Sequence, residues 1–490
     1  MKNIYFLLYI FLLINGVKGF IYSENNRLYD EYGLERIFHG VNVVYKGYPW
    51  HPNIDRFNPE TSFSIEDIEF LKQSGFNAIR LGVMWPGLEP YINQINTTYL
   101  DVLEKIVNMC KENDIYVILD FHQDVLSNKF CGEGIPDWAV FTDNITHPFP
   151  YPIDKPYTLN KGIPLKNDCN KHNWITYQFT QQANKAYQDL YDNYNNIKDK
   201  FIDFWRIIAN RFKNHKNCIG YELINEPWAG DVFKYPELLV PKIADKKNLE
   251  PFYNDIVQGI VNIDSSHSIL FESVTWDIYG VGFEYSPGNR NNKSILSYHA
   301  YFPPNIFIET SFKVRKKDME RLDVGGFLTE FSYGSGNTGD VKDLEKAKEM
   351  VEMADKYLQS WTIWEYKSFF PITGPNKGFF NKDGSLTNTY YTLSRPYAMY
   401  VEGNIVKMGF NNKTKSFNLV FKPNYTINRN SKIYINNRLH FPNGYNINIL
   451  PKLAIKYVKK DNYLYLYLNK TIKTEIVNIL IKPIESHILT

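Results

Sequence analysis

This sequence of 490 residues has no long apolar segment, a net charge close to zero and only four cysteines. The longest apolar run, residues 4–14, has eleven residues, whereas a helix that crosses a membrane needs about 20. We therefore expect no membrane-spanning helix. The formal net charge is only +2, and loss of Lys2 and Lys18 with an N-terminal leader would cancel it. A nearly neutral chain has no overall field that attracts polyanions, so nucleic acid is not expected as a partner.

The N-terminus has the pattern of a secretory signal peptide. Lys2 precedes the apolar run, and small or polar residues follow it at positions 15–19. We predict that residues 1–19 are a signal peptide and that the protein is secreted or enters the lumen of the secretory route. Six N-x-S/T sequences agree with a glycoprotein, although an Asn-rich chain contains several by chance. They begin at Asn96, Asn144, Asn292, Asn412, Asn424 and Asn469.

Only four cysteines occur, and none of them forms a C-x-x-C pair. An even number permits disulfides if the chain passes through an oxidising compartment. Cys131 and Cys169 both lie in a loop-like region, and we predict a disulfide between them. Cys110 and Cys218 lie in apolar sequence that resembles regular structure, which is typical of free buried thiols.

Eight short apolar runs dominate the first three quarters of the chain. Apolar residues make up 44% of the sequence and aromatic residues 16%, which excludes a disordered protein and predicts a large core. Continuous apolar runs rich in β-branched residues are typical of parallel strands buried on both faces. These runs are residues 36–45, 78–85, 116–123, 219–227, 268–276, 294–302, 326–333 and 361–367.

Helix-like sequence alternates with these runs, at residues 64–74, 99–112, 200–212, 249–264 and 341–357. Such alternation predicts an α/β fold, here a (β/α)₈ TIM barrel over residues 20–386. In this fold the active site lies at the C-terminal ends of the strands. The predicted strands carry their His, Asn, Glu, Tyr and Trp residues at those ends, so the fold and the chemistry agree.

Two regions depart from this alternation. The interval 124–218 is longer than an ordinary connection, and we interpret it as an insertion that overhangs the site. From about residue 387 the sequence changes to alternating strands separated by Asn, Gly and Lys turns, which predicts an antiparallel β-sandwich over residues 387–490. Residues 395–397 are expected to join the two domains.

Glu226 and Glu330 are the candidate catalytic residues. Each follows an apolar run at the predicted end of a strand, which would direct both carboxyl groups into one funnel. A lone Glu is usually a solvated surface charge, but two inside apolar strand sequence weaken that reading. Glycoside cleavage requires one protonated carboxylic acid and one carboxylate, and this pair can supply both. Glu222 and Glu272 also interrupt strand runs, but we expect them to lie too far from the strand ends to reach the site and to be paired buried groups.

Other polar and aromatic residues share the strand-end positions. Taken singly, the histidines and the tryptophan among them would more often be core residues, and an arginine would more often be an ion-pair partner. One geometric rule places them together, which favours a site that binds sugar hydroxyls and stacks on a sugar face. A metal site is less favoured, because one imidazole with scattered carboxylates falls short of a zinc pattern. These residues are Arg80, His122, Asp124, His299, Tyr301 and Trp364.

The order of these residues resembles the active site of the family-five glycoside hydrolases, and the resemblance covers the whole barrel. That family has Arg after the second strand, His after the third, Asn-Glu after the fourth, His-x-Tyr after the sixth, Glu after the seventh and Trp after the eighth. The resemblance implies that Glu226 is the acid/base and Glu330 the nucleophile. It also implies that Asn225 bonds the sugar 2-hydroxyl and that Arg80 and Tyr301 support Glu330. The matching residues are Arg80, His122, Asn225, Glu226, His299, Tyr301, Glu330 and Trp364.

Longer segments at residues 81–90, 119–140 and 225–231 are similar to those of the endoglycoceramidases within that family. The resemblance implies retaining hydrolysis of the β-bond between an oligosaccharide and ceramide, with no cofactor and no metal. It further implies that Lys46, Asp124 and Trp364 contact the glucose beside the cleaved bond. Trp85, Trp138 and Trp228 are candidates for lipid contact, but ordinary packing explains them equally well.

The expected partner is a glycosphingolipid, met at a membrane or micelle surface by a monomeric enzyme. Two alternatives remain open from the sequence. One is a β-glucosidase or β-glucanase of the same fold that acts on glucosylceramide, sterol glucosides or other β-glucosides. The other is a non-catalytic glycolipid-binding protein, which has no need of two strand-end glutamates.

Overall fold

The computed structural model describes residues 20–142, 146–276, 278–301, 307–332, 341–370 and 378–484. The predicted signal peptide and Asn144 lie outside these residues. No helix in the described ranges is long and apolar enough to cross a membrane.

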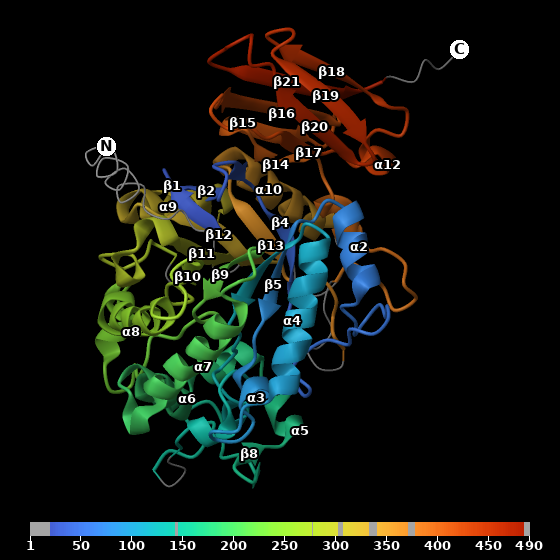
Figure 1. Cartoon of the computed structure of the whole chain (residues 1–490). Coiled ribbons are helices and arrows are strands. Elements are labelled where there is room, and N and C mark those ends of the chain that lie inside the picture. Colours follow the sequence, from blue (N-terminus) through green and yellow to red (C-terminus); the bar gives the residue numbers. More distant parts are fainter. Residues whose placement is uncertain are drawn as a thin grey trace, which may run out of the picture.

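Eight parallel strands close into a barrel, which confirms the predicted fold (Figure 1). The first and last strands pair directly, with Trp361 opposite His39. Nearly every barrel-strand residue is buried, because the strands carry apolar side chains on both faces. In spatial order the strands are β4 (His39–Val43), β5 (Ala78–Gly82), β6 (Tyr116–Asp120), β9 (Cys218–Glu222), β10 (Ser268–Phe271), β11 (Ser294–Ala300), β12 (Gly325–Phe331) and β13 (Ser360–Ile363).

Helices between the strands surround the barrel and cover its outer face. Helix α4 shows why: its buried residues Leu103, Ile106, Val107 and Cys110 recur at the helical spacing of three to four. Its N-cap Asn96 accepts a hydrogen bond from a backbone N–H of the first turn. The main helices are α2 (Ile65–Gln73), α4 (Thr97–Glu112), α7 (Ile197–Phe212), α8 (Glu250–Val261), α9 (Ile308–Leu322) and α10 (Val341–Tyr357). Sequence analysis did not identify α9.

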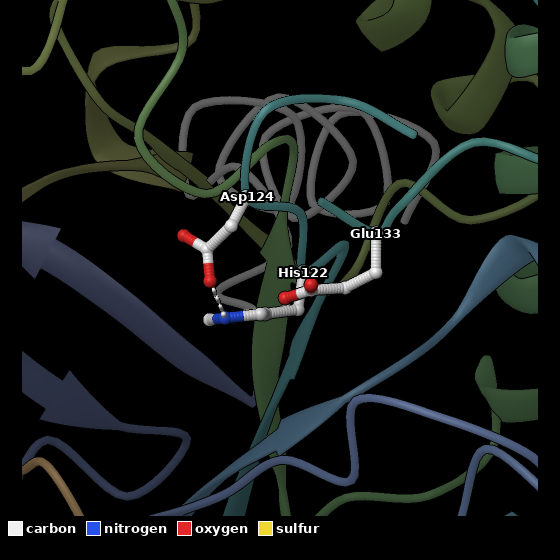
Figure 2. A group of neighbouring side chains, drawn as sticks. All are labelled: His122, Asp124 and Glu133. Atoms are coloured by element: carbon white, nitrogen blue, oxygen red, sulfur yellow. Dashed lines mark ion pairs between the residues drawn. The ribbon is translucent and has the colours of Figure 1, made fainter. Parts of the chain in front are cut away.

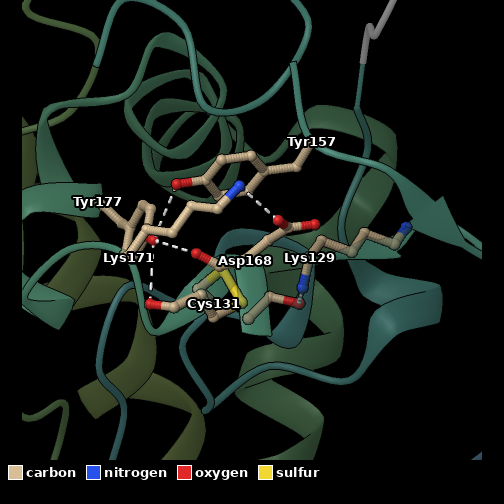
Figure 3. The surroundings of a disulfide bond; sticks show 8 residues. Lys129, Cys131, Tyr157, Asp168, Lys171 and Tyr177 are labelled. Atoms are coloured by element: carbon tan, nitrogen blue, oxygen red, sulfur yellow. Dashed lines mark hydrogen bonds and ion pairs between the residues drawn. A yellow bond between two sulfur atoms is a disulfide. The ribbon is translucent and has the colours of Figure 1, made fainter. Parts of the chain in front are cut away.

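The long connection from β6 to β9 forms an elaborated loop region, as predicted. Its disulfide joins Cys131 and Cys169 (Figure 3), which confirms the predicted pair. The buried Tyr177 hydroxyl donates to the carbonyl oxygens of Asp168 and Cys169 at 3.1 and 3.0 Å. The other two cysteines are free and buried, also as predicted. Regular elements of this connection and its neighbours include α3 (Trp85–Leu88), β7 (Leu159–Asn160), β8 (Ile163–Pro164), α5 (Lys166–Cys169) and α6 (Gln181–Tyr191).

Two antiparallel sheets pack face to face in the C-terminal region, as predicted. The first contains β15 (Gly403–Asn411), β16 (Ser416–Pro423), β18 (Tyr445–Leu450) and β21 (Val477–Pro483). The second contains β14 (Tyr397–Val401), β17 (Ser431–Tyr434), β19 (Ile455–Lys460) and β20 (Tyr463–Leu468). The short helices α11 (Asn388–Leu393) and α12 (Asn437–His440) complete the region.

N-terminal strands extend the second sheet. Strand β3 (Glu35–Arg36) pairs with β14, and β2 (Arg27–Asp30) and β1 (Ile21–Glu24) continue from it. The Glu35 carboxylate also accepts a hydrogen bond from the Ile405 backbone N–H at 2.6 Å. The two ends of the chain therefore form one sheet, and the division predicted near residue 387 stays a prediction.

The sandwich packs on the end of the barrel where the strands begin. The Tyr397 ring stacks on His39, the first residue of β4, with ring centroids 3.6 Å apart. Its hydroxyl donates to the Gly75 carbonyl oxygen at 2.7 Å, just before β5. A buried ion pair of 2.7 Å between Arg395 and Asp355 adds to the contact. These contacts leave the opposite end of the barrel, where the strands end, uncovered by the sandwich. The candidate active site lies at that end.

Candidate active site

The strand ends bring together all the residues that sequence analysis proposed for the site. Arg80, His299 and Glu330 lie on barrel strands, and the rest follow the last residue of a strand within a few positions. The residues after strand ends are Lys46, His122, Asp124, Asn225, Glu226, Tyr301 and Trp364.

Arg80 is the centre of the buried polar network. Its guanidinium donates to Glu330 Oε2 at 3.1 Å and to Asn225 Oδ1 at 2.8 Å. Burial alone would lower its pKa, but the surrounding carboxylates raise it, so the group stays charged. A planar fork with five donors suits such a site, because it can serve several acceptors at once. The other acceptors are Asn42, Asp120 and Glu222.

Glu330 has donors on both carboxylate oxygens. Arg80 bonds to Oε2, and the Tyr301 hydroxyl donates to Oε1. The pKa of Glu330 is raised above its usual value, mainly by burial and also by the negative charge of Glu226, while the Arg80 guanidinium and the Tyr301 hydroxyl oppose this rise. These two donors favour the ionised form, which is the form required of a nucleophile.

Glu226 has a different set of neighbours. Its Oε1 lies 2.8 Å from His299 Nδ1. Burial raises the pKa of Glu226 to about 7, and the negative charge of Asp124 acts in the same direction. Burial also lowers the pKa of His299 to about 4, so the imidazole is neutral at neutral pH. A carboxyl group that is half protonated near pH 7 is suited to acid and base catalysis.

The two carboxyl groups are close together. Oxygen atoms of Glu226 and Glu330, with a ring nitrogen of His299, all lie within 4.8 Å of one another. Retaining glycosidases hold their carboxyl groups about 5 to 5.5 Å apart, whereas inverting enzymes keep them about 6.5 to 9.5 Å apart to admit a water. The geometry therefore matches the retaining arrangement.

A second cluster lies beside this pair and is suited to binding hydroxyl groups (Figure 2). His122 bonds through Nδ1 to Asp120 at 2.8 Å and stacks on the Trp364 ring, with centroids 5.3 Å apart. The Lys46 ammonium contacts the Asp124 carboxylate and lies 4.7 Å from the centroid of the Trp364 ring. The cluster thus combines donors, acceptors and one aromatic face.

Sequence analysis missed Glu133 in this cluster. It lies 3.3 Å from the Lys46 ammonium, and its backbone exchanges hydrogen bonds with that of Asp124. His122, Asp124 and Glu133 are close enough to hold a cation. The Lys46 ammonium already pairs with both carboxylates, and they raise its pKa against the effect of burial. A lysine therefore supplies the positive charge that a metal ion would bring.

The prediction that Glu272 lies too far from a strand end to reach the site was wrong. Strand β10 ends at Phe271, earlier than the run of apolar residues indicates, so Glu272 is the first residue beyond it. Its Oε2 accepts a hydrogen bond of 2.8 Å from the backbone N–H of Glu226. The same prediction was wrong for Glu222, which is the last residue of β9. Glu222 pairs with Arg80 at 2.5 Å, as expected of a paired buried group.

Gln123 is a further residue that the sequence did not single out. Its Nε2 donates to the carbonyl oxygens of Asn225 and Glu226 at 2.7 and 3.0 Å. Its Oε1 accepts from the Tyr187 hydroxyl, which comes from α6 in the long insertion. Its place between His122 and Asp124 was the only signal available in the sequence.

The tryptophans considered for lipid contact are mostly buried. Trp85 is 0% exposed and Trp228 is 3% exposed. Their indole N–H groups donate to Glu89 and Asn184. Ordinary packing accounts for both, and only Trp138 is partly exposed.

Comparison with known proteins places the chain in a family. Residues 39–369 match the model of the cellulases of glycosyl hydrolase family 5, and residues 395–481 match the C-terminal domain of that family. The chain belongs to glycoside hydrolase family 5. Two curated members are similar over most of their length. The endoglycoceramidase of Hydra vulgaris is 42% identical over 90% of this chain and 85% of its own. That of Cyanea nozakii is 41% identical over 88% and 87%.

A solved structure shows the same fold. Endo-glycoceramidase II from Rhodococcus sp., in complex with ganglioside GM3, superposes with a TM-score of 0.75. The match covers 94% of this chain and 99% of that one at 18% sequence identity. The two proteins thus share one fold over almost their whole length.

Proposed function

We propose that this family 5 enzyme is a retaining endo-β-glycosidase that separates the intact oligosaccharide of a glycosphingolipid from its ceramide. The close approach of the Glu226 and Glu330 carboxyl groups carries the proposal, because it fits a double displacement. Two curated endoglycoceramidases that are more than 40% identical over most of the chain supply the substrate class.

In the first step the Glu330 carboxylate attacks the anomeric carbon of the glucose next to ceramide. The bond from that carbon to the ceramide oxygen breaks, and Glu226 gives its proton to the leaving oxygen. The product is a glycosyl ester on Glu330 together with free ceramide. Tyr301 and Arg80 support this step, because their donors hold the Glu330 carboxylate in place and keep it ionised.

In the second step the Glu226 carboxylate takes a proton from a water, and the water oxygen attacks the anomeric carbon. The ester bond to Glu330 breaks, and the oligosaccharide leaves with its original β-configuration. One residue thus acts first as acid and then as base, for which a pKa of about 7 is suitable.

The neighbouring cluster binds the glucose in this proposal. His122 Nε2 is buried and has no hydrogen-bond partner among the described residues, so it is ready to accept from a sugar hydroxyl. Lys46 and Asp124 bond to further hydroxyls, and the Trp364 ring supports the sugar face. Asn225 bonds the 2-hydroxyl while Arg80 holds its side-chain oxygen.

A product assay tests the proposal. The purified protein is incubated with ganglioside GM3 in detergent micelles, and the products are separated. Release of the intact trisaccharide with ceramide is expected. Release of single sugars would show that the enzyme is exo-acting. Cleavage of sterol glucoside or β-glucan in preference to ganglioside would show that glycosphingolipid is not its main substrate. An unchanged glycolipid after prolonged incubation would favour a binding protein.

We further propose that residues 1–19 are removed as a signal peptide and that the secreted chain is a monomeric glycoprotein that acts at membrane or micelle surfaces. The exposed Asn96, Asn292 and Asn424 support modification at three of the six acceptor sequences. The secreted protein should begin near residue 20 by N-terminal sequencing and should lose mass on enzymatic deglycosylation. Size-exclusion chromatography with light scattering should give the mass of one chain.

A further inference from the structure

The backbone of Glu226 adopts a conformation that an L-residue rarely takes. Its φ is +40°, in the left-handed region. For a residue other than glycine such a conformation costs about 1 to 3 kcal/mol and persists only where the surroundings impose it. Side chains do impose it here, because Gln123 donates to the Glu226 carbonyl oxygen and Glu272 accepts from the Glu226 N–H.

Glu272 is itself held firmly. It follows β10, the strand next to β9 in the barrel, and its side chain is 5% exposed. The Tyr253 hydroxyl on α8 donates to the Glu272 carbonyl oxygen at 2.7 Å. This contact anchors the short segment that presents the carboxyl group, so its position is set by the barrel and not by a free loop.

A second contact links Glu272, through His299, to the side-chain carboxyl group of Glu226. Glu272 Oε1 lies 3.5 Å from His299 Nδ1, and the same nitrogen lies 2.8 Å from Glu226 Oε1. Glu272 therefore touches the main chain of Glu226 and the ring that orients its carboxyl group. Loss of the carboxyl group would release both restraints at once.

We propose that Glu272 is a positioning residue that holds Glu226 in the orientation needed to protonate the leaving oxygen. The inference rests on the proposed function of Glu226 as acid/base. Glu272 acts through Glu226 and through His299, and it has no part in forming or breaking a bond.

The hydrogen bond to Glu226 does not depend on a charge at Glu272. Burial raises the pKa of Glu272 well above its usual value, and the nearby carboxyl groups of Glu226 and Glu222 raise it further, with Arg80 opposing. The other charged or titratable groups near this cluster include Lys46, Asp120, Asp124, His299 and Glu330. An uncharged carbonyl oxygen at position 272 accepts from an N–H as well, so glutamine is expected to replace glutamate here.

The test compares two leaving groups. Ceramide is a primary alcohol and needs a proton to leave, whereas dinitrophenolate leaves without one. The measurement is kcat/KM, because it reports the first irreversible step, on GM3 and on 2,4-dinitrophenyl β-lactoside. Glu272→Met, which has similar volume but no acceptor, should lower kcat/KM for GM3 by at least about 30-fold, which is part of the roughly 10²- to 10⁴-fold that general acid catalysis contributes. For the dinitrophenyl lactoside the loss should be less than about 3-fold, and Glu272→Gln should stay within about 3-fold of wild type on both.

Glu35→Ala provides a matched control. Glu35 is also a buried carboxyl group that accepts from a backbone N–H, but it lies in the sheet at the other end of the barrel. The ratio of the two kcat/KM values should equal that of wild type in this variant. Equal losses on both substrates in Glu272→Met would mean a merely structural role and would overturn the inference. If Glu272→Met does not fold, Glu272→Gln decides: a selective loss on GM3 with the glutamine would also overturn it.

Failure of the proposed function would look different. Wild-type enzyme that cleaves the aryl lactoside but leaves GM3 intact would show that ceramide is not the leaving group. The comparison is then made between a methyl and a dinitrophenyl lactoside, which keeps the leaving-group contrast without any lipid. The inference about Glu272 stands or falls on that contrast.

Discussion

Glu226 and Glu330 are buried almost equally, with 7% and 6% of each residue exposed, but their surroundings differ. Glu330 receives hydrogen bonds from a guanidinium and a phenol, which stabilise its charge. Glu226 contacts the neutral His299 imidazole, and the negative charge of Asp124 raises its pKa and so favours the protonated form. The comparison teaches that burial raises both pKa values and that only the neighbours separate the two roles.

The largest expected effect tests the nucleophile. Glu330→Gln should lower kcat on GM3 by about 10⁵-fold, because an amide cannot form the glycosyl ester. Single-turnover measurements with mass spectrometry should show a glycosyl adduct on the wild type and none on the variant. The melting temperature should change little, since glutamine keeps the acceptor for Tyr301. Substantial turnover by this variant would show that Glu330 is not the nucleophile.

The second prediction distinguishes the acid/base from the nucleophile by the configuration of the reaction product. Glu226→Ala should lower kcat/KM for GM3 by about 10²- to 10⁴-fold. With dinitrophenyl lactoside, added azide should restore turnover and give the β-lactosyl azide, because azide attacks the ester on Glu330 without base assistance. An α-azide, identified by NMR, would instead mean that Glu226 is the nucleophile.

The third prediction weakens the charge stabilisation of Glu330. Tyr301→Phe removes a donor that lowers the pKa of this carboxyl group, so its pKa should rise. Glu330 must be ionised to attack, and the acidic limb of the kcat/KM profile should therefore move to higher pH. The loss at the optimum should be about 10- to 100-fold, as for a hydrogen bond to a charged group. An unchanged acidic limb would assign that limb to another group.

The smallest effect concerns Glu226. Activity should fall as pH rises through about 7, because the acid must be protonated. Asp124→Asn removes a negative charge that raises the pKa of Glu226, so the alkaline limb should move to lower pH by less than about 1 unit. The acidic limb should keep its place in this variant, in contrast to Tyr301→Phe. A shift to higher pH would contradict the proposed electrostatics.

Much of this comparison was accessible from the sequence, since all eight barrel strands and both carboxylates follow from apolar runs that end in polar residues. Glu272 and Gln123 hold the backbone of Glu226, and their role was not predicted. Glu272 was misplaced because an apolar run does not show where ladder hydrogen bonding stops. The positive φ of Glu226 and the hydrogen bonds from Gln123 to the backbone of Asn225 and Glu226 depend on how neighbouring strands are aligned. The sequence of a single strand does not show this alignment. Glu133 lies in a loop whose path is set by its backbone pairing with Asp124.

The pairing of β3 with β14 has a consequence for how the protein is made. Ribosomes add about 5 to 20 residues per second, so β3 emerges at least about 20 s before its partner strand exists. Until then the N-terminal hairpin exposes an open edge, which is a template for wrong association. Completion of the second sheet thus reports that translation has reached the C-terminal region. A chain that stops early would keep that edge unpaired.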